Sequence, residues 1–115
     1  MAWNVETTDE YNAWFLAQTE SGQTSIRMKV ELLEEYGPYL PRPHADTLKG
    51  SKLKNLKELR TQTENNVFRV AFIFDKKRKA ILLIGGDKKG KDEKRFYQNL
   101  IKQAEEIYQQ YQIEY

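Results

Sequence analysis

The sequence contains no cysteine, one histidine and three prolines among its 115 residues. Without cysteine, the chain can form no disulfide bond, zinc–thiolate site or cysteine nucleophile. Because His44 is the single histidine, a ribonuclease mechanism that needs two histidines is excluded. No apolar run approaches the roughly 18 residues of a membrane span, and the acidic N-terminus lacks the order of a secretion signal. We therefore expect a cytoplasmic protein that does not contact a membrane.

The sequence also lacks a large net charge, since basic and acidic side chains sum to only +2. The charge is nevertheless segregated: residues 36–95 carry sixteen basic against seven acidic side chains, giving +9, whereas residues 1–35 sum to −5. A basic middle between acidic ends indicates a polyanion-binding face. The alternative is that the lysine-rich turns are merely solvated. Hydrophobic residues make up 39% of the chain, enough for one core, and the length predicts a single domain over residues 1–115.

The N-terminal third predicts a strand followed by two antiparallel helices. "WNVETT" alternates as a strand does, and Thr7 with Glu10 forms the pattern of a helix capping box. A second helix is expected to begin near Thr24 and to end at Gly37, with Pro38 behind it. Apolar residues at helical spacing support both helices: Tyr11, Trp14 and Phe15 in the first, and Ile26, Val30 and Leu33 in the second.

The remainder predicts an irregular loop, three strands and a helix. The strands lie in "KNLKELRT", "NNVFRVAFIFD" and "AILLIGG", the last expected near the centre of the sheet. Alternation in the second strand places Arg69 on the face opposite a row of phenylalanines. Short turns between these strands predict an antiparallel meander. A helix from about Asp92 has an apolar stripe, and the expected order is β-α-α-β-β-β-α, an α+β fold. The stripe consists of Phe96, Leu100, Ala104, Ile107 and Tyr111, whereas Lys94, Gln98, Lys102, Glu105 and Gln109 are expected to face water.

A glycine motif joins the last strand to this helix. Gly85 to Lys91 read G-x-x-x-x-G-K, but Asp92 replaces the hydroxyl residue that a nucleotide-binding loop places on magnesium. No later strand remains to supply a second acid, so a nucleotide hydrolase is not favoured. The loop either holds another phosphate or is a turn in which Gly85, Gly86 and Gly90 supply unusual backbone angles.

Basic and phenolic side chains should gather beside this turn. Arg69, and Arg60 with it, would lie on one sheet face, with Lys88 and Lys89 at the edge and Tyr97 one turn into the helix. Arginine forks bind phosphate oxygens in a bidentate manner. Each residue also has a structural interpretation, since Arg60 and Arg69 could form ion pairs and Tyr97 could sit at the core edge. No histidine or carboxylate cluster has metal-ligand spacing, so we expect no metal and no cofactor.

Three segments resemble a known family: "DTLKGSKLKNLKELR", "FRVAFIFD" and "ILLIGGDKKGKDEKRFY" are similar to the phage-derived subgroup of HigB-type toxins in the RelE superfamily. The resemblance implies the RelE fold, an antiparallel sheet with two N-terminal helices and a C-terminal helix. It also implies the toxin of a type II toxin–antitoxin system. Such a toxin cleaves mRNA on translating ribosomes by attack of the adjacent 2′-hydroxyl on the phosphate. The implied partners are mRNA and a helix-turn-helix antitoxin, through which operator DNA would be reached.

The same resemblance implies roles for individual residues. Arg60 and Arg69 would stabilise the scissile phosphate, and Lys88 would add charge or donate a proton. Tyr97 would transfer a proton or stack on a base, and Glu58 would be the general base or pair with Arg60. Further RNA contacts are assigned to Lys54, Lys57, Lys89, Lys91 and Arg95. The alternatives are a non-catalytic RNA-binding module, or a protein that acts mainly through its complex with antitoxin and operator DNA.

Overall fold

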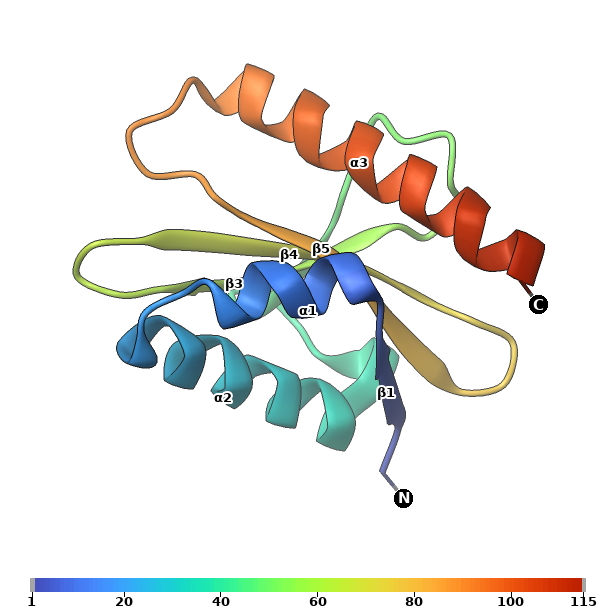
Figure 1. The fold of residues 1–115 in the computed structure, drawn as a ribbon. Coiled ribbons are helices and arrows are strands. Elements are labelled where there is room, and N and C mark those ends of the chain that lie inside the picture. The colour runs from blue at the N-terminus through green and yellow to red at the C-terminus, as the bar shows by residue number, and fades with distance from the viewer. Residues whose placement is uncertain (1, 115) are drawn as a thin grey trace.

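The sheet of this protein has five strands with helices on both faces (Figure 1). The structure is a computed structural model, and it describes residues 2–114. Helices α1 (Asp9–Leu16) and α2 (Glu20–Tyr36) run antiparallel across one face, and α3 (Glu93–Glu114) covers the other. The strands are β1 (Asn4–Thr7), β2 (Ala45–Thr47), β3 (Lys57–Gln62), β4 (Val67–Phe74) and β5 (Lys79–Asp87), and a short 3-10 helix, η1, spans Gly37–Tyr39.

The spatial order of the strands is β1-β5-β4-β3-β2. The predicted antiparallel meander of β3, β4 and β5 is confirmed. β5 is an internal strand, as expected, although β4 is the middle one. The expectation of a purely antiparallel sheet is corrected, because β1 pairs with β5 in parallel. The sheet also gains an edge strand, β2, within the segment predicted as a loop, where only three residues pair with β3. The strand predicted in "KNLKELRT" is shorter in the structure, since β3 starts at Lys57.

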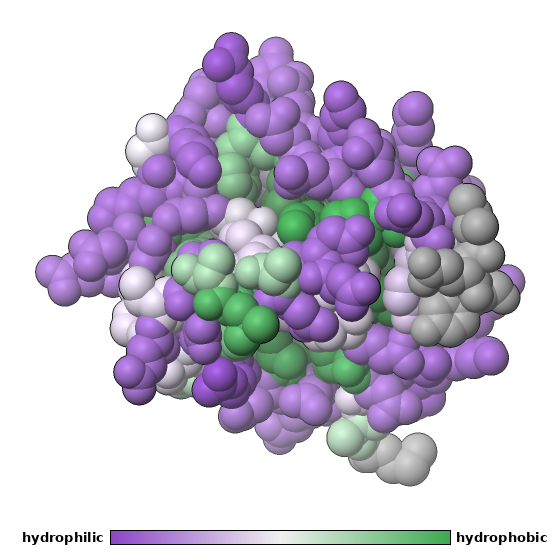
Figure 2. All heavy atoms as spheres, in the orientation of Figure 1, coloured by the Kyte–Doolittle hydropathy of each residue, from purple (hydrophilic) through white to green (hydrophobic). Residues whose placement is uncertain are grey.

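Two hydrophobic clusters, one on each face, hold the layers together. The phenylalanine row of β4 packs under α1 and α2, while Ala71 and Ile73 of the same strand pack under α3. The strict alternation of β4 therefore divides its side chains as predicted. The stripe on α3 is also confirmed, with Leu100 and Ala104 fully covered. Figure 2 shows a mainly hydrophilic surface with hydrophobic residues visible between α1 and α3.

The helix ends follow capping rules, with two corrections to the prediction. Thr8, not Thr7, caps α1, and its hydroxyl accepts the N–H of Tyr11 at 3.0 Å. α2 begins at Glu20, four residues before the predicted start, because the Thr19 hydroxyl caps it through the N–H of Gly22. Residues 20–23, which the prediction left outside the helix, are thus the first turn of α2. Its C-terminal cap at Gly37, with φ of 55°, is confirmed.

A bulge in β5 decides which way the first two glycines of the motif, Gly85 and Gly86, face. Ala71 pairs with Ile84 but Phe72 pairs with Leu82, so Leu83 is an extra residue. The buried Thr8 hydroxyl donates a 2.6 Å hydrogen bond to the Leu83 carbonyl. Beyond the bulge the strand continues to Asp87 and contains both glycines.

Gly85 and Gly86 are required for close packing, which corrects the prediction that they supply unusual backbone angles. A side chain at Gly85 would overlap the ring of Trp14 from α1, and one at Gly86 would approach the ring of Phe96 from α3 to 3.0 Å. Of the three glycines in the motif, only Gly90 has a positive φ, at 72°. Asp92 begins the helix as expected, since its carboxylate accepts the N–H of Arg95 at 2.9 Å. The motif is therefore a strand end and a helix start, with one glycine in the turn.

Candidate active site

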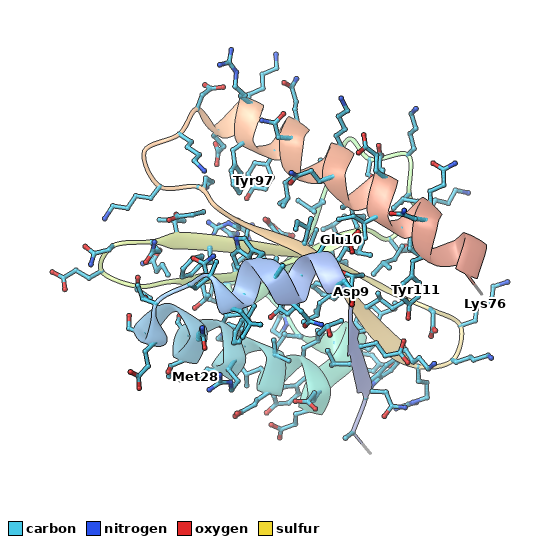
Figure 3. The ribbon with its side chains drawn as sticks, viewed as in Figure 1. Asp9, Glu10, Met28, Lys76, Tyr97 and Tyr111 are labelled. Atoms are coloured by element: carbon cyan, nitrogen blue, oxygen red, sulfur yellow. The ribbon has the colours of Figure 1, made fainter. Side chains whose placement is uncertain are left out.

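Three side chains from three elements meet on the sheet face that α3 covers. The Tyr97 hydroxyl donates to Glu58 Oε1 at 2.8 Å and accepts a hydrogen bond from Arg69 Nε at 3.1 Å. Glu58 Oε1 lies 3.6 Å from Arg69 Nε, so the carboxylate and guanidinium also form an ion pair. Figure 3 shows Tyr97 beneath the first turns of α3, between that helix and the sheet. We call these three residues the triad.

The strand register explains why the triad forms. Glu58 on β3 pairs with Ala71, and Arg69 on β4 pairs with Gly86, so both charged residues point to the α3 side. Arg69 is held further by a 2.9 Å hydrogen bond from Nη1 to the Phe68 carbonyl. Because Gly86 has no side chain, α3 can approach closely enough for its Tyr97 to reach Arg69.

Burial makes the triad chemically unusual. Glu58 is 5% and Arg69 is 6% exposed. Burial raises the pKa of Glu58, an effect that the Tyr97 hydrogen bond and the charges of Arg69 and Arg60 only partly offset. Burial, followed by the negative charge of Glu58, also raises the pKa of Tyr97. The carboxylate is therefore a stronger base than usual, and the phenol that touches it keeps its proton at neutral pH.

Two further cations lie beside the triad. Lys88 Nζ sits 5.6 Å from the centre of the Tyr97 ring and forms a 2.8 Å ion pair with Glu93. The Lys88 hydrogen bond and charge lower the pKa of the exposed Glu93 carboxyl. Arg60 lies directly across from Arg69 in the β3–β4 register, and Arg60 Nη1 is 3.8 Å from Asp46 Oδ2.

Both outer ion pairs are exposed enough to exchange partners. The Glu93 side chain is 69% exposed and that of Asp46 is 37% exposed. Ion pairs at the surface contribute little stability, about 0–1 kcal/mol. A phosphate could therefore replace either carboxylate at low cost. The structural interpretations of Arg60 and Arg69 as ion-paired residues are correct, but Arg69 is locked inside the triad, whereas Arg60 is accessible.

Other residues assigned to RNA contacts lie elsewhere. Lys89 turns to the β3–β4 hairpin, where its Nζ donates to the Glu64 carbonyl at 2.9 Å. Lys91 and Arg95 line a groove of about 600 Å³ between α1 and α3, which Trp14 closes on the α1 side. In the unbound protein Lys89 therefore contacts this hairpin, whereas Lys88 lies beside Tyr97. Lys91 and Arg95 belong to a groove outside the triad.

Two lysines of the basic middle also fall outside the triad. Lys57 pairs with Phe72, whose ring belongs to the α1–α2 side, so strand alternation puts Lys57 on the sheet face opposite Glu58. Lys54 is exposed in the connection between β2 and β3. Neither lysine forms a hydrogen bond or ion pair with Glu58, Arg69 or Tyr97, whose side chains are all described.

The sequence interpretation missed the two carboxylates that neutralise the outer cations. Asp46 was overlooked because it lies in β2, a three-residue strand that propensity does not reveal. Glu93 was not paired with Lys88 in the prediction, although a spacing of five residues suits an ion pair across a turn. Glu105, expected to face water, instead accepts hydrogen bonds from Ser51 Oγ and the Lys52 N–H, at 2.9 and 2.6 Å.

Metal binding and membrane insertion have no structural support in the described part of the chain. Among residues 2–114, no group of three or more His, Asp or Glu side chains is placed to hold a metal ion. Within the same residues, no helix has both the length and the apolar content for crossing a bilayer.

Comparison with known proteins shows the family of the chain. Residues 13–109 match the family described as "Phage derived protein Gp49-like (DUF891)". The chain is 42% identical over 93 residues to "Putative toxin HigB3" of Mycobacterium tuberculosis, covering 81% of this chain and 79% of that protein. It is 34% identical over 109 residues to "Putative toxin HigB2" of the same organism, covering 94% of this chain and 53% of that protein.

Solved structures share the fold at low sequence identity. A mutant of Escherichia coli toxin RelE in the free state has a TM-score of 0.62 at 11% identity, covering 88% of this chain and 95% of that one. RelE from the Pyrococcus horikoshii RelE–RelB complex has a TM-score of 0.57 at 16% identity, covering 78% and 99% of the two chains. The M. tuberculosis RelBE2 toxin–antitoxin complex gives 0.59 at 12% identity, covering 76% and 99%. The chain therefore belongs to the phage-derived Gp49-like family, as a toxin of the HigB type with a RelE-like fold.

Proposed function

We propose that this toxin is an endoribonuclease that cleaves mRNA without a metal ion. The observation that carries the proposal is the Tyr97 hydroxyl, held between a buried carboxylate and a buried guanidinium. A phenol with a buried base behind it can move a proton at neutral pH. Membership of the HigB-type toxins supports the choice of RNA as the substrate.

The reaction we propose is attack of a ribose 2′-hydroxyl on the adjacent phosphate. The new O–P bond forms as the 5′-oxygen bond breaks, leaving a 2′,3′-cyclic phosphate and a free 5′-hydroxyl. Tyr97 accepts the 2′-hydroxyl proton while passing its own proton to Glu58 Oε1. Because Glu58 is only 5% exposed, it acts through Tyr97 and does not touch the substrate.

The cations stabilise the phosphate as its negative charge increases. Arg60 releases Asp46 and Lys88 releases Glu93, and both then bind the phosphate oxygens. Charge stabilisation by pre-positioned donors is commonly the largest contribution to catalysis of this kind. Lys88, next to the Tyr97 ring, is also placed to protonate the leaving 5′-oxygen. Arg69 stays in the triad, where its charge offsets that of ionised Glu58 and its Nε orients the phenol.

We further propose that the toxin acts on translating ribosomes and is neutralised by a cognate helix-turn-helix antitoxin. Two of the structurally similar proteins, from M. tuberculosis and P. horikoshii, are toxin–antitoxin complexes. Operator DNA would be contacted through the antitoxin. Co-expression with the product of the neighbouring reading frame, followed by co-purification, tests this partner.

The decisive experiment compares Tyr97→Phe with Tyr39→Phe. Tyr39 is 83% exposed and is not part of the triad, so its substitution removes a phenol hydroxyl without changing the triad. Inducing the wild-type chain or the Tyr39 variant should arrest bacterial growth and fragment mRNA. Tyr97→Phe should lower the cleavage rate about 10²- to 10⁴-fold, the usual contribution of a proton-transfer group.

Three results would count against the proposal. One is normal growth with intact transcripts at good expression of the wild-type chain, which would favour a non-catalytic RNA-binding module. Another is full activity of a folded Tyr97→Phe variant, checked by circular dichroism, which would remove the triad from the mechanism. The third is loss of cleavage in EDTA, which would show that a metal is needed.

A further inference from the structure

A groove next to Tyr97 extends away from the triad along α3. It has a volume of about 460 Å³. One wall is the connection between β2 and β3, which rises beside α3 (the green segment in Figure 1), and the other wall is α3 itself. The lining residues used below are Lys49 from the connection and Lys94, Tyr97, Lys102 and Glu105 from α3.

Three lysines face this groove, and none of them is paired with a described carboxylate. Lys49, Lys94 and Lys102 are exposed, and none forms a hydrogen bond or ion pair with any residue whose side chain is described. The cations beside the triad differ in this respect, since Lys88 and Arg60 both have carboxylate partners. Like charges on both walls of a groove repel one another, and a bound polyanion removes that repulsion.

The acidic residue that lines the groove is used to build its wall. Glu105 Oε2 accepts the Ser51 hydroxyl at 2.9 Å and the Lys52 N–H at 2.6 Å. These bonds tie the connection to α3 and hold Lys49 across from Lys102. The carboxylate thereby fixes the spacing of the lysines, with no salt bridge to any of them.

We infer that this lysine groove binds a stretch of single-stranded RNA that continues from the phosphate held at the triad. This inference rests on the proposed function, because it assigns a path to the same substrate. Lys94 and Lys102 are eight residues apart, which is about 12 Å along a helix, enough for successive phosphates of one strand. Tyr97, at the triad end, offers an aromatic ring to a base, and cations with an aromatic platform are the usual features of single-strand sites.

The groove contacts the RNA backbone and gives no sequence preference. A lysine ammonium is a compact point charge that does not read base edges in the manner of a bidentate side chain. The groove therefore increases affinity for any single strand and aligns it on the triad. Removing its charges should raise KM and leave kcat nearly unchanged.

The test measures binding of a short, fully 2′-O-methylated single-stranded RNA, which lacks the attacking hydroxyl and cannot be cleaved. The double variant Lys49→Gln with Lys102→Gln removes one charge from each wall. The matched control, Lys76→Gln with Lys77→Gln, removes two charges from the β4–β5 turn, and Figure 3 shows Lys76 at the opposite end of α3 from Tyr97. Fluorescence anisotropy is recorded over a series of salt concentrations.

The groove variant should bind more weakly, and its plot of log affinity against log salt should be shallower by about 1.4, since each phosphate contact on a single strand contributes about 0.7. The control should keep the wild-type slope. An unchanged groove variant, an equal loss in the control, or no binding by wild type overturns the inference. Failure of the proposed function is recognised separately, through cleavage of unmodified mRNA by the wild-type toxin.

Discussion

Substituting Glu58 by glutamine separates the proposed catalytic role of the triad from its contribution to stability. The ordinary pKa of a glutamate is 4.5, and burial raises that of Glu58 above it in the folded protein. The folded state therefore binds this proton more tightly than the unfolded chain does. By linkage, the stability associated with protonated Glu58 is fully present below about pH 4.5 and is lost as pH rises through the raised pKa.

The effect of Glu58 ionisation on the free energy of unfolding has an upper bound. Between the unfolded and folded pKa values, one such group lowers the free energy of unfolding by at most about 1.4 kcal/mol per pH unit. Glutamine cannot ionise, yet its carbonyl can still accept the Tyr97 hydroxyl. The variant should resemble wild type with Glu58 protonated, so its stability should differ by only about 1 kcal/mol at low pH.

At neutral pH, two arguments about the buried ion pair predict opposite changes in stability for Glu58→Gln. Removing one partner of such a pair commonly costs about 3–5 kcal/mol. Here the raised pKa means that burial disfavours the carboxylate more than Arg69 and Tyr97 stabilise it. We therefore expect Glu58→Gln to be at least as stable as wild type at pH 7–8, while cleavage falls about 10²- to 10⁴-fold with the loss of the base.

Urea unfolding of both proteins from pH 4 to pH 8, followed by tryptophan fluorescence, measures this directly. Glu6, Asp87 and Glu93 have lowered pKa values and contribute with the opposite sign. Their contributions are common to both proteins, so the difference between the two stability curves isolates Glu58. Parallel curves, or a variant about 3–5 kcal/mol less stable at neutral pH, would refute the reasoning.

Two other predictions concern the strand that carries the glycine motif. Gly85→Ala should lower the free energy of unfolding by about 1–3 kcal/mol, because the new methyl overlaps the Trp14 ring; an unchanged urea midpoint would mean that α1 can shift freely. Asp87→Asn should lower the free energy of unfolding by about 1 kcal/mol at pH 7. Burial alone would raise the pKa of Asp87, but hydrogen bonds from Asn66, Val67 and the Lys89 N–H lower it below 3.8. The stabilisation by ionised Asp87 is therefore present above pH 3.8 and lost as pH falls through the lowered pKa, so the deficit of the variant should shrink in acid; a deficit that stays constant down to pH 2 would contradict this assignment.

Local sequence determined the elements that form the frame of the site. Alternation in β4 placed Arg69 on the correct face, because a strand's side chains take one side or the other by parity alone. The apolar stripe of α3 and the glycine cap of α2 were equally legible, since each depends on residues within one or two turns. Features that depend on a single helix or strand were therefore predictable.

Only the tertiary structure decided which side chains meet. Glu58 and Tyr97 are 39 residues apart, and their hydrogen bond depends on the β3–β4 register and on how closely α3 approaches the sheet. The close approach of α3 depends on Gly86. The bulge at Leu83 decides that Gly85 faces α1 and Gly86 faces α3. None of these distances is encoded in a local pattern.

The charge pattern shows the same division most clearly. Composition identified residues 36–95 as basic, but folding distributes these cations among the triad side, the α1–α3 groove and the lysine groove. Which cations form an ion pair depends on which carboxylates the fold places beside them, such as Asp46 on the short edge strand β2. The sequence by itself determined the frame and the excess of basic side chains in residues 36–95, whereas long-range packing decided where on the surface those charges lie without a carboxylate partner.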